Sequence, residues 1–146
     1  MNYLTIFILS SLAGLGFCFI FTVKKRNILI CALCSGLAWT SLKYLESIGV
    51  STVFASLVSA FILGIITEIA AVKLKSPAIN FMIIGFIPLV PGLKCYQGIL
   101  RLIEGNQAEG TALLFEAIFI AIAISISFLL TSSIVKMIRQ IKARKK

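Results

Sequence analysis

The chain has 146 residues, of which 60% are hydrophobic and only 13% are charged. Soluble domains are usually about a quarter charged, so a soluble globular fold is excluded and an integral membrane protein is predicted. The formal net charge is +9, but the basic residues form short clusters beside apolar runs, a pattern typical of membrane topology signals that does not indicate nucleic-acid binding.

Five apolar runs predict an all-α bundle, because a membrane-crossing helix needs about 20 residues. The first run precedes its basic cluster, so we expect a retained span and not a secretory signal. The second run is short, and snorkelling of Lys43 is expected to extend it before a loop at 43–51. Without a polar linker, residues 1–146 form one predicted transmembrane domain. Its predicted spans are residues 4–23, 27–42, 52–72, 77–93 and 111–135, with a basic tail at 136–146.

The basic residues also predict the orientation. If all five runs cross, every basic cluster falls on one side of the membrane, and only isolated basic residues fall on the other. Because cytoplasmic loops carry the excess of Lys and Arg, we expect the N-terminus outside and the C-terminus in the cytoplasm. The odd number of spans, without an internal repeat, suggests half of a larger assembly. The clusters are residues 24–26, 73–75 and 136–146, and the isolated residues are Lys43, Lys94 and Arg101.

Small residues at four-residue spacing predict where helices approach closely, since lipid gives little hydrophobic driving force between spans. Every predicted span except the fourth has such a stripe. This pattern favours a tight bundle or an intimate subunit interface, including a homo-oligomer. The stripes are Ser10 and Gly14; Ala32, Gly36 and Thr40; Ser56, Ala60, Gly64 and Glu68; and, on two faces of the last span, Ala117, Ala121 and Ser125 or Ala123, Ser127 and Thr131.

The fourth run is interrupted by Pro88, Pro91 and Gly92. Neither proline can donate a main-chain hydrogen bond, so the carbonyl groups of Ile84 and Ile87 are expected to lose their helical partners. Lipid cannot replace those partners, which requires that the break be enclosed by protein or wetted by a cavity. Broken helices of this kind often mark substrate sites in transporters, and a purely structural kink is the alternative.

Polar residues follow the break on one side of a helix. Lys94, Gln97 and Arg101 stand at positions i, i+3 and i+7, while Tyr96 lies with the apolar residues. Such a cationic, amide-bearing face can receive a small solute that carries a carboxylate. The alternative is an interfacial helix with a hydrated polar face.

Two glutamates lie within the apolar part of the chain. Glu68 continues the small-residue stripe of the third span and is predicted to face the interior, where a carboxylate can couple transport to an ion or proton. Its alternative is an interfacial carboxylate that reaches headgroups or pairs with Lys73. Glu116 is expected to be a solvated carboxylate at the outer surface.

The sequence offers no catalytic constellation. It contains no histidine and no aspartate, and its five glutamates are dispersed. Cys31 and Cys34 have the spacing of half a metal site, but no second pair completes it. No ATP-binding loop is present, so transport would draw on a gradient or on another subunit. We expect no enzymatic activity, cofactor or metal.

The stretch IPLVPGLKCYQGILRLIEG, residues 87–105, resembles the threonine/serine exporter family, and most closely its small, stand-alone membrane half. The family pattern is I-P-L-V-P-G with a tyrosine four residues after the glycine, which Tyr96 supplies. Upstream, Glu68, Lys73 and Pro77 also fit the family pattern. The predicted five-span plan and the length agree with it as well.

This resemblance implies export of small amino acids such as threonine and serine, or of dicarboxylates such as succinate, across the plasma membrane. It also implies a larger five-span partner subunit of the same family. A non-transporting membrane scaffold or assembly subunit is the alternative of a different class. The predicted translocation residues are Pro88, Pro91 and Gly92 at the break and Lys94, Tyr96 and Gln97 lining it, with Glu68 as the coupling candidate.

Overall fold

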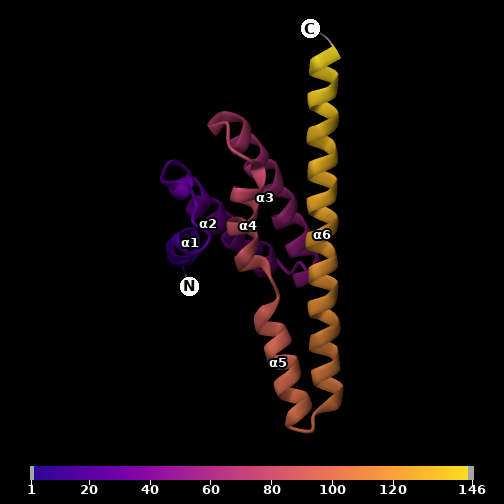
Figure 1. Ribbon diagram of the computed structural model, residues 1–146. Helices are drawn as coiled ribbons and strands as arrows, with labels where there is room; N and C mark the ends of the chain where they lie inside the picture. The colour runs from indigo at the N-terminus through magenta and orange to yellow at the C-terminus, as the bar shows by residue number, and fades with distance from the viewer. Residues whose placement is uncertain (1, 145–146) are drawn as a thin grey trace.

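The computed structural model describes residues 2–144, and the side chains of all of these except 139 and 142–144. Within these residues the regular structure is entirely helical, and five stretches are long and apolar enough to cross a membrane. The predicted all-α fold with five spans and a broken fourth helix is therefore confirmed (Figure 1). The elements are α1 (Tyr3–Ile20), α2 (Lys25–Ser47), α3 (Thr52–Leu74), α4 (Ala78–Phe86), a 3₁₀ turn η1 (Ile87–Leu89), α5 (Gly92–Ile103) and α6 (Gln107–Arg144).

Helices α1 and α2 form a pair that glycine brings together. A Cβ atom on Gly14 would lie 2.6 Å from the Cβ of Ser35, and one on Gly36 would lie 2.9 Å from the Phe7 ring. Across this contact the Ser35 hydroxyl donates to the main-chain carbonyl of Ser10 at 2.9 Å. The stripes predicted for the first two spans therefore face each other.

Helix α2 extends beyond the predicted second span and ends at Ser47. Lys43 and Glu46 consequently lie on its last turns, although the sequence suggested a loop there, and their i, i+3 spacing favours the helix. The hydroxyls of Ser47 and Tyr3 are 2.8 Å apart, which joins the end of α2 to the start of α1.

Helices α3 and α6 meet along a second line of small residues. A Cβ atom on Gly64 would lie 2.7 Å from the Thr131 hydroxyl. The Ser127 hydroxyl donates to the Leu57 carbonyl at 2.7 Å. Two faces were considered for the last span. The face of Ala123, Ser127 and Thr131 is buried at all three positions, whereas on the other face Ala117 is buried but Ala121 and Ser125 are exposed.

Helix α4 packs against both α2 and α3 (Figure 1). Phe81 and Ile84 are fully buried on it. A Cβ atom on Gly85 would lie 2.8 Å from the Leu63 side chain, so the fourth span also has a close-approach residue. The fourth span has no repeating stripe, and this single glycine gives space to the Leu63 side chain of α3.

Helices α5 and α6 form a hairpin whose crossing point consists of Gly98 and Gly110. A Cβ atom on Gly110 would lie 2.9 Å from the Gly98 carbonyl oxygen. The turn between the helices uses Gly105 at φ 87°, a left-handed conformation that glycine adopts without strain.

Figure 1 shows that α5 and the first part of α6 extend beyond the body formed by α1–α4. Helix α6 then continues past the predicted 111–135 span into the basic tail, whose residues 145–146 lie outside the described part of the chain.

Candidate functional site

The break between α4 and α5 is a single 3₁₀ turn followed by an extended residue. Val90 is extended, with φ −62° and ψ 129°, as expected for a residue that precedes proline. Its N–H donates to the Ile87 carbonyl at 3.3 Å, and the Gly92 N–H donates to the Val90 carbonyl at 2.8 Å. The expectation of an unpaired Ile87 carbonyl was therefore wrong, because the chain tightens into a 3₁₀ turn that supplies a new donor.

A cavity of about 170 Å³ lies beside this break. It is smaller than the roughly 300–1,000 Å³ of pockets that hold drug-sized ligands, so it suits a solute of few atoms. Four parts of the fold form its wall: α2, α3, the segment from η1 into α5, and α6. The lining residues are Trp39, Leu42, Lys43, Glu46, Thr52, Ser56, Leu89, Val90, Pro91, Leu93, Lys94, Gln97 and Ile120.

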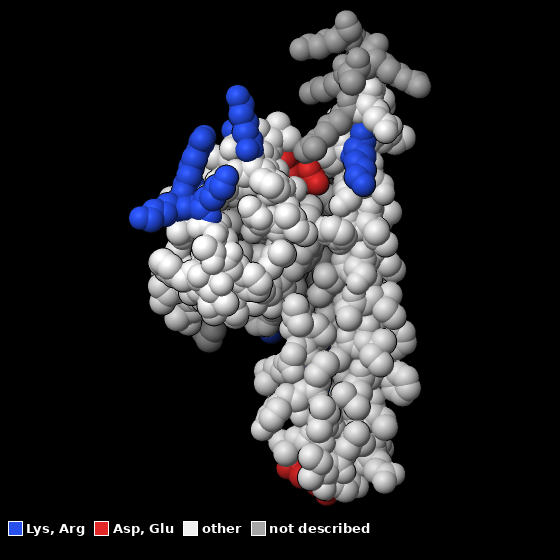
Figure 2. All heavy atoms as spheres, in the orientation of Figure 1, with Lys and Arg blue, Asp and Glu red and all other residues white. Residues whose placement is uncertain are grey.

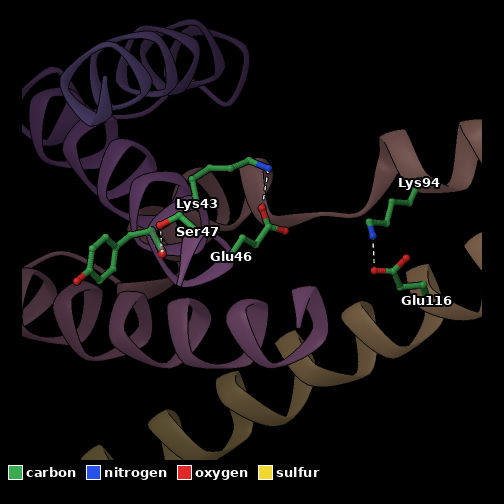
Figure 3. A network of polar contacts seen from close by, with 6 residues as sticks. Lys43, Glu46, Ser47, Lys94 and Glu116 are labelled. Atoms are coloured by element: carbon green, nitrogen blue, oxygen red, sulfur yellow. Dashed lines mark hydrogen bonds and ion pairs between the residues drawn. The ribbon is translucent and has the colours of Figure 1, made fainter. Parts of the chain in front are cut away.

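Two ion pairs hold the charged residues of the cavity in place. Within α2, Lys43 Nζ lies 2.8 Å from Glu46 Oε2 and 4.8 Å from the centre of the Trp39 ring, a cation–π distance. Lys94 on α5 forms a hydrogen-bonded ion pair with Glu116 on α6. Figure 3 shows the extended segment of the break running between the two pairs. The cavity wall thus presents the ammonium groups of Lys43 and Lys94 and the carboxylate of Glu46, and Glu116 pairs with Lys94 from α6; all four side chains are partly buried.

Comparison with known families agrees with this architecture. The family model described as Threonine/Serine exporter, ThrE, matches residues 6–134. The chain belongs to the threonine/serine exporter family. The match covers the break, the cavity and both ion pairs, and it establishes a multi-pass membrane protein of an exporter family. No solved structure matches the chain.

The residues that the sequence singled out in this exporter-family chain occupy different places around the break. Pro91, Lys94 and Gln97 line the cavity. Pro88 lines a separate groove of about 280 Å³ formed with α1 and α2. Tyr96 is 63% exposed and borders an outer groove of about 460 Å³ that also contains Gln97.

Gly92 is exposed and begins α5, and a Cβ atom there would have open space around it. Its contribution to the site is therefore conformational. It supplies the first residue of the new helix directly after Pro91, whose ψ of 39° ends the extended segment.

Glu68 lies at the other end of α3 from the cavity. It lines a pocket of about 300 Å³ that also contains Lys75 and Ser76. Lys75 ends α3 in a left-handed conformation with φ 50°, which turns the chain toward α4. The structure thus separates Glu68 from the break and places it among polar residues of the α3–α4 connection.

Sequence reasoning did not assign Trp39, Lys43, Glu46 or Ser56 to the site. The i, i+4 spacing of Trp39 and Lys43 and the i, i+3 spacing of Lys43 and Glu46 were available signals. Glu116 was expected to be a solvated surface carboxylate. Its side chain is partly exposed, and it also pairs with Lys94, because α5 folds back along α6.

No cluster of three or more histidine, cysteine or acidic side chains occurs among the described residues in an arrangement suited to a metal ion. The four cysteines are free thiols, and three of them are buried among apolar helices. The charged and polar side chains of the cavity wall offer charge pairing and hydrogen bonding.

Proposed function

We propose that this chain is a membrane subunit of a secondary exporter that moves small amino acids such as threonine and serine through the cavity at the α4–α5 break. The observation that carries the proposal is the mixture of charges in a small cavity beside a broken helix. Broken helices place main-chain polar groups at the depth where transporters bind their solutes. The chain would bind and release its solute unchanged and would not act as an enzyme.

The charge pattern favours a zwitterion. An amino acid carries one carboxylate and one ammonium group, and the cavity wall offers Lys94 for the first and Glu46 for the second. In the free protein Lys43 pairs with Glu46 and Glu116 pairs with Lys94, so neither group that would bind the solute is an unpaired charge before the solute arrives. A dicarboxylate such as succinate would meet Glu46 directly and is less well matched to this wall.

We further propose the N-terminus outside, the C-terminus in the cytoplasm, and the plasma membrane as the location. Figure 2 supports this orientation, because most of the visible Lys and Arg side chains gather at one end of the molecule, whereas acidic residues are seen both near that end and at the opposite end, where α5 turns into α6. The larger five-span subunit of the same family is the proposed partner, since five spans in one chain leave no two-fold repeat.

The experiment is uptake of labelled threonine by inside-out vesicles from cells that produce this chain, the larger subunit, or both. Joining α4 to α5 with Pro91→Ala and Gly92→Leu should abolish uptake while the amount of membrane protein stays normal. Gly92→Ala alone is the matched control, because its methyl group meets no neighbour. Full uptake by the double variant would remove the break from the mechanism, and full uptake by the larger subunit alone would favour a scaffold.

A further inference from the structure

Basic residues at the two ends of the molecule differ in whether the protein itself pairs them. Beside the cavity and on the α5–α6 hairpin, Lys43, Lys94 and Arg101 each form an ion pair with a glutamate. At the other end, five exposed basic residues around the α1–α2 and α3–α4 connections form no ion pair with any described residue. We call them the basic patch; they are Lys24, Lys25, Arg26, Lys73 and Lys75.

The fold brings the two halves of the basic patch together. Asn27 directly follows the first half and Ser76 directly follows the second, and Asn27 Nδ2 donates to Ser76 Oγ at 3.0 Å. One turn further along α2, Cys31 Sγ lies 3.7 Å from the carbonyl oxygen of Asn80 on α4. The starts of α2 and α4 therefore lie side by side. Most of the Lys and Arg side chains visible in Figure 2 gather at this end.

The helix starts at this joint add to the positive potential. Neither α2 nor α4 has a side-chain hydrogen bond that caps its N-terminus, so the partial positive charge of both helix ends is not offset by a capping oxygen. Glu68 shares a pocket with Lys75. One carboxylate beside five cations still leaves the basic patch with an excess of positive charge, which favours an anionic ligand.

Exposed apolar side chains lie next to the cations on each of the three helices. Leu29 on α2 is 66% exposed, Val72 on α3 is 60% exposed and Ile79 on α4 is 49% exposed. Each of them is within four residues of a member of the basic patch. A phospholipid also places an anionic phosphate next to apolar chains, so this surface matches a lipid better than it matches a free anion.

We infer that the basic patch is one binding surface for the phosphate group of an anionic phospholipid, which bridges the α1–α2 and α3–α4 connections. This inference goes beyond the proposed transport function and does not depend on which solute is moved. The proposed orientation places the patch at the cytoplasmic leaflet, where basic surfaces between membrane helices bind anionic head groups. A lipid that contacts both halves binds only the folded arrangement, so it stabilises the folded protein.

The experiment measures thermal unfolding of the purified chain in an uncharged detergent. Phosphatidylglycerol, phosphatidylcholine with the same acyl chains, or inorganic phosphate is added over a range of concentrations. Phosphatidylglycerol should raise the unfolding temperature at concentrations at which phosphatidylcholine and inorganic phosphate have no effect. The concentration that gives half of the rise reports the apparent affinity.

One substitution in each half tests whether the halves act together. Lys25→Gln and Lys73→Gln should each weaken the apparent affinity for phosphatidylglycerol about fivefold, the effect of one cation near a membrane surface. Lys73→Arg is the matched control at the same position and should retain the affinity, because it keeps the charge. Arg101→Gln removes one cation at the opposite end of the molecule and should also retain it. Without lipid, all four variants should unfold at the wild-type temperature, since these side chains are exposed.

Equal stabilisation by phosphatidylglycerol and phosphatidylcholine would overturn the inference. Equal stabilisation by inorganic phosphate would also overturn it and would identify a site for a free anion. An equal loss in Arg101→Gln would show an effect of net charge alone, and a loss in only one of Lys25→Gln and Lys73→Gln would show that the two halves are not one surface. No solute is present in these measurements, so their outcome is independent of the proposed transport.

Discussion

Two helix pairs, α1–α2 and α5–α6, pack through glycines on both of their helices, and they differ in what else holds them. In the α1–α2 pair, Gly14 and Gly36 are buried, and the added polar contacts are between uncharged groups: the Ser35 hydroxyl with the Ser10 carbonyl, and the hydroxyls of Tyr3 and Ser47. In the α5–α6 hairpin, Gly98 and Gly110 are buried, but ion pairs of Lys94 with Glu116 and of Arg101 with Glu109 connect the helices. Charged side chains can exchange a protein partner for a charged solute. Under the proposed function, the hairpin is therefore the part that would respond to solute, and the α1–α2 pair would keep its packing.

The largest effect on stability is expected from a substitution at the contact between α1 and α2. Gly14→Ala should destabilise the protein by about 1–3 kcal/mol, because the new methyl group collides with Ser35 and approaches the Ala32 main chain. Gly16→Ala on the same helix should have almost no effect, since nothing lies within 4 Å of its Cβ position. Thermal unfolding in detergent measures both variants, and equal stability of the two would contradict the assigned packing.

An intermediate effect is expected at the hairpin crossing. Gly98→Val should separate α5 from α6, because its Cβ would lie 2.9 Å from the Leu114 side chain and 3.1 Å from the Gly110 carbonyl oxygen. The body should remain folded while uptake of threonine by vesicles is lost, since the wall supplied by Lys94 and Gln97 moves. Limited proteolysis should detect the change as new cleavage near Gly105 with α1–α4 still protected. Unfolding of the whole chain by this variant would show that the hairpin and the α1–α4 body form one cooperative folding unit.

The smallest effect on stability is expected when the two charges of the Lys94–Glu116 ion pair are exchanged. This exchange is also the most direct test of whether the ion pair binds solute or only connects the helices. Exchanging them with Lys94→Glu and Glu116→Lys keeps an ion pair between α5 and α6, and a partly exposed pair contributes only about 0–1 kcal/mol. Stability should therefore be nearly unchanged, but threonine uptake should fall at least about tenfold, because a carboxylate now stands where the solute carboxylate would bind. Normal threonine uptake by this double variant would mean that Lys94 stabilises the α5–α6 hairpin and does not bind the solute.

The sequence was sufficient for the spans and for the break because both depend on local signals. A run of about 20 apolar residues predicts a membrane helix, and proline predicts where the helix stops. The end of α2 was misjudged because hydropathy falls at Lys43, although the helix continues through charged residues that pair within it. The 3₁₀ turn that satisfies Ile87 depends on how α4 ends, which hydrophobic pattern does not specify.

The composition of the site was harder to predict because it depends on contacts between distant residues. Lys94 and Glu116 lie on different helices, and they meet because Gly98 and Gly110 let α5 fold back along α6. No pattern in the sequence indicates that those two glycines lie at the same helix crossing. Likewise, Ser56 belongs to a stripe that predicts helix packing, and only the fold places this residue in the wall of the cavity.

The length of α6 has a practical consequence for experiments on topology. Its 38 residues extend about 57 Å, nearly twice the hydrocarbon thickness of about 30 Å. A tilt of about 40°, at the upper end for membrane helices, still leaves it too long to be submerged. Because the excess length must project into water at one end or both, a fluorescent or biotin reporter at the Asn106 turn, probed with an impermeant reagent, tests whether this end of α6 projects.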